Sequence, residues 1–255
     1  MNNALKFTLP VFVLPFLVIS GIIWGGWWSF YAVLVAFGLI PFLELFLKGN
    51  QENFTAEEEA IERKNSWYDY LIYSVVFIQY FMLFLFAYRI SQLNLTWYEY
   101  IGMTWTMGLA CGILAINLGH ELGHRTKKYE QNMAKSLLLT SLYMHFYIEH
   151  NRGHHKNIAT PLDPATSRLN EPIYKFYFRS IIGGWLSAWH LESHRLKKMG
   201  ISFWSIQNEM LRFQVIQFTY LITLFTIFSL VGPFGWKSGL VVVAGAIGAA
   251  ILGIL

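Results

Sequence analysis

"INLGHELGHRTKK" (Ile116–Lys128) joins the end of an apolar run to two histidines and a cluster of basic residues. The run before it, Ile101–Leu118, has no charged side chain. A helix of roughly 17–25 apolar residues crosses a bilayer, and basic residues at its end are typical of the cytoplasmic side. The stretch therefore predicts a transmembrane helix that carries His120 and His124 at its cytoplasmic end.

The composition of the whole chain also predicts a membrane protein. Hydrophobic residues occupy 55% of its 255 positions and charged residues only 13%, whereas about 25% of residues are charged in an ordinary soluble domain. We expect an all-α fold, a six-span transmembrane helical bundle with a histidine-rich cytoplasmic helical cap, in a single integral membrane domain over residues 1–255. The predicted spans are residues 9–30, 31–48, 68–89, 99–119, 212–236 and 238–255, and the cap, which is the predicted cytoplasmic metal-binding region, is residues 120–211.

The basic residues orient this bundle. With a cytoplasmic N-terminus, all but two of the 19 Lys and Arg residues lie on the cytoplasmic side, and only Arg89 and Lys237 lie outside. This distribution is a strong positive-inside bias. No basic face interleaves with base-stacking aromatic residues, so the net charge of +4 does not indicate a nucleic-acid partner. The single cysteine, Cys111, excludes an internal disulfide framework and a cysteine-based zinc site.

Two stretches of the cap have helical patterns of their own. Ser136–Ile148 is apolar but too short to cross the membrane, so it predicts one buried or partly inserted helix. Asn170–Gly200 places aromatic and basic residues at helical spacing. That pattern predicts helices on the cytoplasmic membrane surface, with Lys and Arg side chains extended toward water.

Five histidines in two clusters are the strongest chemical signal in the chain. His120 and His124 are four residues apart, so a helix presents both imidazoles on one face, where they can bind one metal ion. The second cluster, "EHNRGHHK", contains His150 and His154 at the same spacing, with His155 directly after them. Two such clusters, each following an apolar helix, predict a metal centre in the cap.

The first cluster also matches H-E-x-x-H, the zinc signature of metalloproteases. In that alternative His120 and His124 bind zinc, Glu121 is the general base, and a third protein ligand is needed. It gives the second histidine cluster no role. Many imidazoles with few carboxylates suit borderline metals such as iron. We therefore favour a two-metal site, in which Glu121 and Glu149 orient imidazoles through their ring N–H groups.

Other polar residues of the cap have less specific patterns. Asp163 lies in "TPLDPAT", where two prolines predict a rigid turn. The sequence leaves open whether Asp163 caps that turn or hydrogen-bonds an imidazole near the metals. His145 is expected to be a hydrogen-bonded interior histidine, and it could also line the route to the metals. His190 and His194 are expected on the surface, because the basic residues around them disfavour a metal cation.

Four stretches resemble the membrane-bound alkane monooxygenases, within the wider class of membrane di-iron hydroxylases and desaturases. They are "NLGHELGHR" (Asn117–Arg125), "EHNRGHHK" (Glu149–Lys156), "ATPLDPATSR" (Ala159–Arg168) and "WHLESHRLKKMGISFWSIQNEML" (Trp189–Leu211). The first two match the family's first two histidine boxes. Desaturases share these boxes but not the third stretch. The likeness extends from about the third span to residue 255.

This resemblance implies a non-haem di-iron monooxygenase. Two Fe ions, held by His120, His124, His150, His154 and His155, would activate O2 and hydroxylate the terminal carbon of a medium- or long-chain alkane taken from the bilayer. A rubredoxin, reduced by an NADH-dependent rubredoxin reductase, would deliver the electrons. The protein would lie among the lipids of the bacterial inner (plasma) membrane, with its N-terminus and metal site cytoplasmic. A fatty acid desaturase, a xylene-type hydroxylase, the zinc metalloprotease and a non-catalytic membrane fragment are the alternatives.

The chain departs from the family at its C-terminal side. The family's third histidine box and one further ligand histidine would follow the sixth span, and this sequence stops at Leu255. We therefore expect a C-terminally truncated chain. Two iron ions held mainly by imidazole need more than five histidines, so the 255-residue form is expected to be inactive or poor in metal.

Overall fold

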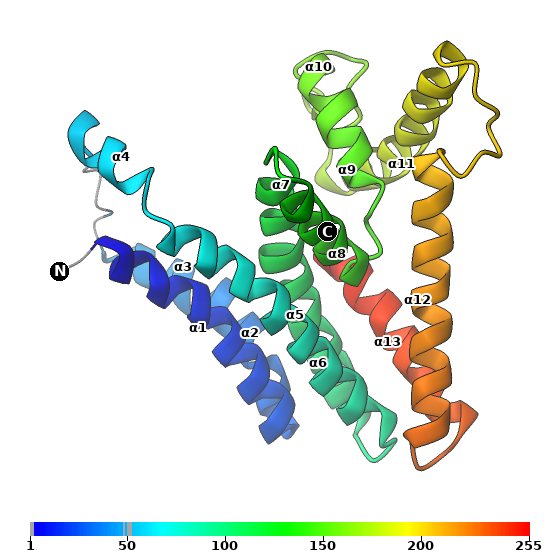
Figure 1. Cartoon of the computed structure of the whole chain (residues 1–255). Coiled ribbons are helices and arrows are strands. Elements are labelled where there is room, and N and C mark those ends of the chain that lie inside the picture. Colours follow the sequence, from blue (N-terminus) through cyan, green and yellow to red (C-terminus); the bar gives the residue numbers. More distant parts are fainter. Residues whose placement is uncertain (1–2, 48, 50–52) are drawn as a thin grey trace.

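The computed structural model describes residues 3–47, 49 and 53–255, and these residues form helices without a strand (Figure 1). The predicted all-α fold is thereby confirmed. Lys48, the end of the predicted second span, and residues 50–52 of the following connection lie outside the described part. The helical elements are α1 (Asn3–Trp24), η1 (Gly26–Phe30), α2 (Tyr31–Leu34), η2 (Val35–Leu39), α3 (Ile40–Glu44), α4 (Ala56–Glu62), α5 (Trp67–Ser91), α6 (Trp97–Leu109), η3 (Ala110–Ile116), α7 (Asn117–Gly123), α8 (Lys128–Thr140), α9 (Phe146–Glu149), η4 (His150–His154), α10 (His155–Asn157), α11 (Ile173–Lys198), α12 (Glu209–Val231) and α13 (Trp236–Ile254).

Five described helical stretches are long and apolar enough to cross a membrane, where the sequence predicts six. They are Gly26–Glu44, Trp67–Ser91, Trp97–Gly123, Glu209–Val231 and Trp236–Ile254. The predicted span 9–30 corresponds to α1, whose apolar part, Thr8–Trp24, is shorter. The predicted span ended at residue 30, but α1 ends at Trp24. Gly25 and Gly26 have positive φ angles and turn the chain into the next helix.

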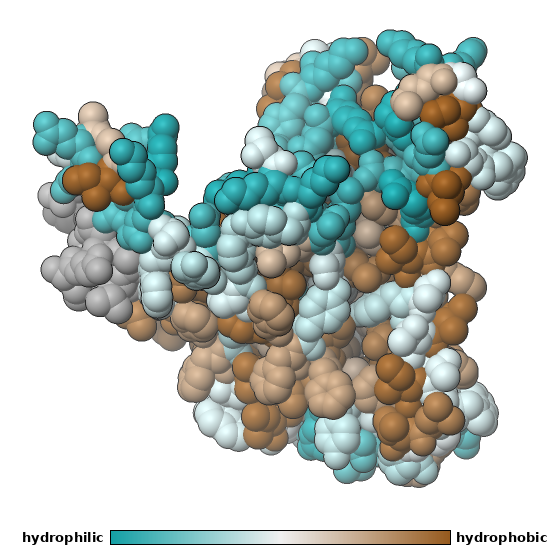
Figure 2. All heavy atoms as spheres, in the orientation of Figure 1, coloured by the Kyte–Doolittle hydropathy of each residue, from teal (hydrophilic) through white to brown (hydrophobic). Residues whose placement is uncertain are grey.

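The surface of the bundle is apolar where lipid would cover it. Large side chains such as Phe77, Phe218 and Leu230 are more than two-thirds exposed. Figure 2 shows hydrophilic residues gathered over the upper end of the molecule and apolar residues over the bundle below. The turns between α5 and α6 and between α12 and α13 lie at the opposite, lower end (Figure 1). This distribution is that of a membrane protein with one polar cap.

Backbones pack closely inside the bundle where α13 meets η3. A Cβ atom at Gly112 would lie 2.6 Å from the carbonyl oxygen of Gly253. Small residues allow such an approach, which is a common way of packing transmembrane helices. Cys111, next to Gly112, is fully buried in the same core. This packing places the C-terminal residues of α13 beside the segment that leads to His120.

The cap differs from the prediction in one respect. Ser136–Ile148 is not one helix, because α8 ends at Thr140 and α9 begins only at Phe146. Leu142, between them, has a left-handed φ of 50°. The break is held by polar contacts to the bundle: Gln79 donates to Thr140 Oγ1 at 3.2 Å, and Ser141 Oγ donates to the Cys111 carbonyl at 3.3 Å. The turn redirects the chain so that α9 and η4 lie over the end of α7.

Candidate metal centre

Four histidines from two separate segments meet in the cap. His120 lies on α7 and His124 directly after it, whereas His150 opens η4 and His155 opens α10. Their ligand nitrogens all lie within 4.8 Å of one another. The Nε2 atom of His124 is 3.2 Å from that of His150 and 3.3 Å from that of His155, and the last two are 3.0 Å apart. Four of the five predicted ligands are therefore in one cluster.

The pairing within the second histidine cluster depends on an unusual helical turn. His150 and His155 are five residues apart, which on an α-helix would separate their directions by about 140°. The segment η4 is π-helical, with hydrogen bonds that span five residues. The wider turn brings His150 and His155 onto one face. From the sequence, His150, His154 and His155 were all predicted as ligands, and the α-helical i, i+4 spacing paired His150 with His154.

The nitrogen separations fit a shared metal ion. Metal–imidazole bonds are about 2.0–2.1 Å long, so two nitrogens on one ion are about 2.8–3.4 Å apart at angles between 90° and the tetrahedral value. All three Nε2 separations among His124, His150 and His155 fall in this range. Three nitrogens this close cannot all hydrogen-bond one another, because each neutral imidazole nitrogen is either a donor or an acceptor. The donor set therefore suits an ion at their common centre.

His150 is held in the form that binds metal. Burial, and then the neighbouring imidazoles of His120, His155 and His124, lower its pKa to about 3. A neutral imidazole has a free lone pair for a metal ion, whereas a protonated one does not. His150 is therefore neutral at physiological pH.

The fifth predicted ligand, His154, lies beside the cluster and not within it. Its ring stacks on that of His150 with centroids 5.2 Å apart, and its Nδ1 is 2.9 Å from Asp163 Oδ2. Asp163 also accepts hydrogen bonds from the Ala165 backbone N–H and from the Thr166 hydroxyl. Both interpretations of Asp163 therefore hold in the structure, since it caps the turn and contacts an imidazole.

The charge of Asp163 sets the tautomer of His154. Burial raises the pKa of Asp163, but the hydrogen bonds from Thr166 and Ala165 and the nearby His154 outweigh this effect, so the pKa lies below its ordinary value. An ionised carboxylate only accepts, so His154 Nδ1 carries the hydrogen and donates it. Nε2 of His154 then keeps a lone pair that can bind a metal ion.

The two glutamates of the histidine clusters differ in environment. Glu121 is exposed and accepts hydrogen bonds from Arg125 at 3.0 and 3.2 Å. Glu149 is buried, and the Ser187 hydroxyl lies 3.5 Å from it. Burial, and then the charge of Asp163, raises the pKa of Glu149 to about 7. In the described part of the chain neither carboxylate hydrogen-bonds an imidazole of the cluster; Asp163 contacts His154, which lies beside the cluster.

A comparison with protein families identifies the fold around this cluster. The family model described as fatty acid desaturase matches residues 95–255, which contain every histidine of both clusters. The chain belongs to the fatty acid desaturase family. This membership favours an oxygen-activating iron site over the zinc-protease alternative.

Individual relatives show which enzymes this member of the fatty acid desaturase family is similar to. An "Alkane 1-monooxygenase" of Pseudomonas putida is 40% identical over 195 residues, 75% of this chain and 48% of the relative. One of Ectopseudomonas oleovorans is 40% identical over 205 residues, 78% of this chain and 51% of the relative. The "Xylene/toluene monooxygenase hydroxylase component XylM" of Pseudomonas putida is 30% identical over 98 residues, 38% of this chain and 27% of the relative. The predicted likeness to membrane alkane hydroxylases is confirmed. The chain spans about half the length of the alkane 1-monooxygenases that it matches.

An ion-pair network behind the cluster was not anticipated from the sequence. Arg152, in the second histidine cluster of this desaturase-family chain, contacts Glu192 at 2.9 Å and Glu209 at 2.8 Å. Both carboxylates are buried. Glu209 also contacts Lys135 at 2.7 Å, and Glu192 contacts Arg195 at 2.6 Å. The network joins η4 to α8, α11 and α12. In the sequence, Glu192 and Glu209 are single acidic residues with basic residues nearby, and this pattern is the signal that could have indicated the network.

The remaining histidines lie outside the cluster. His190 and His194 are exposed on α11, as expected. His145 is buried with 6% of its surface exposed, but its Nε2 has no hydrogen-bond partner among the described residues. The prediction of an interior histidine is confirmed, and its hydrogen bonding stays a prediction. His145 lines a cavity next to His150 and His154, which agrees with the second role considered for it.

An apolar cavity approaches the cluster from the transmembrane bundle of this family member. It has a volume of about 470 Å³ and lies between η2, η3 and the end of α13, lined by residues such as Phe37, Gly112, Ile116 and Phe146. The Phe146 ring stacks on His150 with centroids 4.8 Å apart, and its centroid is 6.2 Å from that of His120. An apolar molecule in this cavity would therefore end beside the histidines.

Proposed function

We propose that the chain forms part of a membrane alkane 1-monooxygenase that hydroxylates the terminal carbon of medium- or long-chain alkanes with O2. The observation that carries the proposal is the convergence of His120, His124, His150 and His155 beside the apolar cavity. Non-haem iron, bound at this donor set, supplies the activation of dioxygen. The similarity to alkane 1-monooxygenases supports this choice of reaction.

The residues of the chain have distinct roles in this proposal. The four clustered histidines would hold one of the two Fe ions, and His154 offers its Nε2 as a further ligand. Asp163 keeps the hydrogen of His154 on Nδ1. Phe146 forms the wall between the histidines and the apolar cavity. Such a cavity needs few polar contacts for an alkane, which already dissolves in the surrounding lipid.

The reaction also requires an electron donor. We propose a rubredoxin, reduced by an NADH-dependent rubredoxin reductase, which would reach the cap from the cytoplasm of a bacterium whose inner membrane holds the bundle. The positive-inside distribution of Lys and Arg supports a cytoplasmic cap. An acidic donor would be attracted by this basic side of the protein.

A fatty acid desaturase is the second candidate, because the family model itself carries that description. The two activities give different products from the same kind of centre. A hydroxylase converts octane to 1-octanol, whereas a desaturase introduces a double bond into an acyl chain. Gas chromatography of membranes supplied with octane or with stearoyl lipids separates these outcomes. The similarity to the xylene/toluene hydroxylase component adds m-xylene as a third substrate for the same assay.

Metal binding is the first test of the proposed function. The purified 255-residue chain, incubated anaerobically with Fe(II) alone, is expected to bind iron, measured by mass spectrometry of the metal. His124→Ala should lose most of it, because His124 contacts both His150 and His155. His190→Ala is the matched control and should retain it, since His190 is exposed outside the cluster. Retention of zinc with peptide hydrolysis would overturn the proposal.

Turnover is the second test. Since the chain spans about half of its relatives, the assay compares residues 1–255 alone with these residues joined to the part of the Pseudomonas putida relative that lies outside the match. With rubredoxin, its reductase, NADH and octane, the joined chain is expected to form 1-octanol. We expect none from residues 1–255 alone, because five imidazoles are too few for two iron ions. An iron-loaded joined chain without alcohol formation would refute the proposed reaction.

A further inference from the structure

The first half of α11 carries large apolar side chains that the described part of the protein leaves exposed. Tyr174 is 76% exposed, Phe178 73% and Ile182 57%, and Trp185 is also exposed. The four residues are separated by four, four and three positions, so they project from one side of the helix. We refer to Tyr174, Phe178, Ile182 and Trp185 as the apolar face of α11. Exposed apolar residues gathered in this way mark a contact surface for protein or membrane.

The apolar face is turned in the direction in which the second half of α11 meets the start of a transmembrane helix. An α-helix completes five turns in 18 residues, so Tyr174 projects in the same direction as Glu192. Phe178 and Leu196 are related in the same way, and both Glu192 and Leu196 are buried. Glu192 accepts a hydrogen bond of 2.7 Å from the backbone N–H of Glu209, the first residue of α12. The first half of α11 therefore presents its apolar face toward the level at which α12 begins.

The rest of the cap packs on other sides of this half of the helix. Gly183 lies against the loop before α11, since a Cβ atom there would be 2.9 Å from Pro164 Cβ. Gly184 is buried, and a Cβ atom there would be 4.0 Å from Glu149 Cγ. Gly183 and Gly184 lie about 120–140° around the helix from Phe178. The protein thus holds α11 from a flank and leaves the apolar face to another partner.

Basic side chains border the apolar face. Lys175 follows Tyr174, and Arg168 lies in the loop before α11; both are exposed. Leu169, next to Arg168, is 95% exposed. Tyr and Trp are enriched at the headgroup level of membranes, and helices that lie in this interface combine such rings with Lys and Arg, which reach toward the lipid phosphates. The chemistry of the apolar face and its border therefore fits lipid.

The position of the apolar face also favours lipid as its partner. On α12, side chains such as Phe218, which is 68% exposed, cover the outside of the bundle with apolar surface. Figure 2 shows the hydrophilic cap directly above this apolar surface. Because the apolar face points toward this boundary, the lipid around α12 is the medium that it meets.

We propose that the first half of α11 is an interfacial helix, with its apolar face inserted among the acyl chains of the leaflet on the cap side. Lys175 and Arg168 extend from its border to the headgroups. The second half of α11 packs against η4 and α12 and carries the exposed His194 in water. The sequence pattern of Asn170–Gly200 predicted helices on the membrane surface; the structure assigns that role to one half of one helix. This inference depends on the membrane bundle and not on the proposed reaction.

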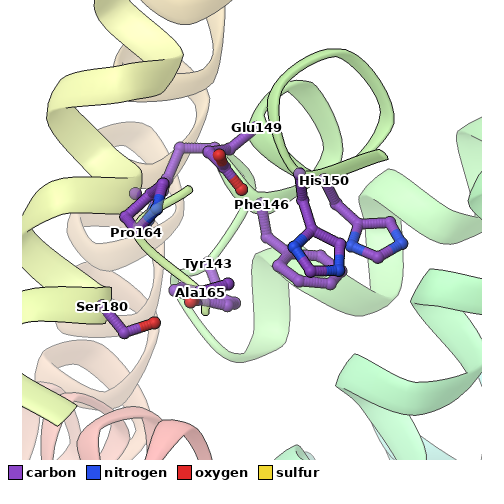
Figure 3. A pocket seen from close by; sticks show the side chains of 10 residues that line it. Tyr143, Phe146, Glu149, His150, Pro164, Ala165 and Ser180 are labelled. Atoms are coloured by element: carbon purple, nitrogen blue, oxygen red, sulfur yellow. The ribbon is translucent and has the colours of Figure 1, made fainter. Parts of the chain in front are cut away.

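The contact with lipid bears on the metal centre, because α11 also forms a wall of the cavity beside it. Ser180 and Gly184 line this cavity of about 240 Å³ together with Glu149 and His150. Figure 3 shows Ser180 and His150 on different sides of the cavity. Ser180 lies about 160° around the helix from Phe178. Lipid would therefore support the helix from the side opposite the cavity.

Spin labels on the 255-residue chain in phosphatidylcholine nanodiscs measure the depth of this helix. Cys111 is the single cysteine and is buried, so a Cys111→Ala background accepts one label at Phe178→Cys or Ile182→Cys. Collisions with O2, which dissolves in lipid, and with a water-soluble nickel chelate then give the depth of the label. We expect both labels about 5–10 Å inside the headgroup boundary. Phe218→Cys is the lipid reference, and His194→Cys, on the same helix, is the matched control and should report water.

A label at Lys175→Cys fixes the rotation of the helix. It should report the headgroup level, nearer to water than Phe178→Cys, because Lys175 lies at the border of the apolar face. Labels at Phe178→Cys and Ile182→Cys that collide with the nickel chelate as often as His194→Cys would overturn the interfacial helix. The same labels are measured in residues 1–255 joined to the relative's unmatched part. Loss of collisions with both reagents there would show that protein covers the face, which would also overturn the proposal.

The labelled positions are exposed, so the variants are expected to keep the wild-type unfolding temperature. Two positions on the apolar face allow the depth to be measured even if one variant does not fold.

Discussion

The Nε2 atoms of His124 and His155 lie 3.3 Å apart, although the two residues are 31 positions apart in the chain. His124 follows the end of a transmembrane helix, and His155 follows a π-helical turn of the cap. Neither helix can bind a metal ion tightly with the ligands that it carries alone. The metal centre therefore depends on how the cap is held over the bundle, and the predictions below test the groups that hold it.

Asp163→Asn should weaken metal binding without unfolding the turn. Asparagine still accepts the Ala165 N–H, but it removes the charge that keeps the hydrogen on His154 Nδ1. Loss of such a partner typically lowers metal affinity about 10–100-fold. Titration of the apo-protein with Co(II), followed by its visible absorption, measures this affinity. Thr166→Val, which removes one hydrogen bond to Asp163 and the one that the Thr166 hydroxyl accepts from the Ala159 N–H, should have a smaller effect. Equal affinities of wild type and Asp163→Asn would exclude the role of Asp163.

Arg152→Met should destabilise the cap. It leaves Glu192 and Glu209 without their shared cation, and both carboxylates are buried. Breaking a fully buried pair costs about 3–5 kcal/mol. Because Arg152 itself is 37% exposed, we expect a loss of about 2 kcal/mol after discounting for solvent screening. Thermal unfolding in detergent measures the change. Arg63→Met, which breaks the exposed pair with Glu59, is the control and should cost less than about 1 kcal/mol.

The ion pair of Glu171 with Arg179 should make stability depend on acid pH. Hydrogen bonds from Arg179, at 2.7 and 2.8 Å, lower the pKa of Glu171 to about 2, whereas it is about 4.3 in an unfolded chain. A carboxylate with a lowered pKa stabilises the fold above the unfolded value, and this contribution disappears as the pH falls toward the folded value.

Glu171→Gln is therefore expected to be less stable than wild type at pH 6 and equally stable near pH 2. Unfolding temperatures of the two proteins between pH 2 and pH 7 provide the comparison. The gap should close mainly between pH 4.3 and pH 2. A gap that persists unchanged at pH 2 would show that the pair is not responsible.

Gly112→Ala should disturb the contact between α13 and η3. The added Cβ would lie 2.6 Å from the Gly253 carbonyl oxygen, so one backbone has to move. Overpacking of this kind costs about 1–3 kcal/mol, and the shift would also reshape the apolar cavity. Gly38→Ala is the matched control, because a Cβ atom there meets nothing within 4 Å. The test is the difference in unfolding temperature between these two variants in the same lipid environment.

Much of the architecture could be predicted from local sequence. The uncharged runs around Tyr70–Tyr88 and Phe213–Trp236 lie in helices that are long and apolar enough to cross a membrane. The prediction was less accurate where two elements share one apolar run. The predicted first span continued through Gly25, where a positive φ turns the chain. Ser136–Ile148 was expected to be one helix, because hydropathy does not show the left-handed residue Leu142.

The metal centre, like the fold, could be predicted where it depends on local sequence and not where it depends on tertiary contacts. The residue types and the two clusters were evident in the sequence, because i, i+4 spacing on a helix is a local geometric rule. The rule paired His150 with His154, and His155 was predicted as a ligand beside them; the π-helical turn of η4 places His155 next to His150, whereas His154 contacts Asp163. Arg152, inside this turn, contacts Glu192 and Glu209, which lie far along the chain and could not be paired with it from local sequence.

By itself, the sequence determined that this protein is helical, crosses a membrane and carries histidines at the end of a span. These properties depend on hydropathy and spacing over roughly 20 residues, and each helix satisfies its own backbone in lipid. Only the tertiary structure decided which histidines meet, which carboxylate contacts an imidazole, and where the cavities beside the cluster lie. These features depend on contacts between residues such as Gln79 and Thr140, or Arg152 and Glu209, that are distant in the chain and adjacent only after folding.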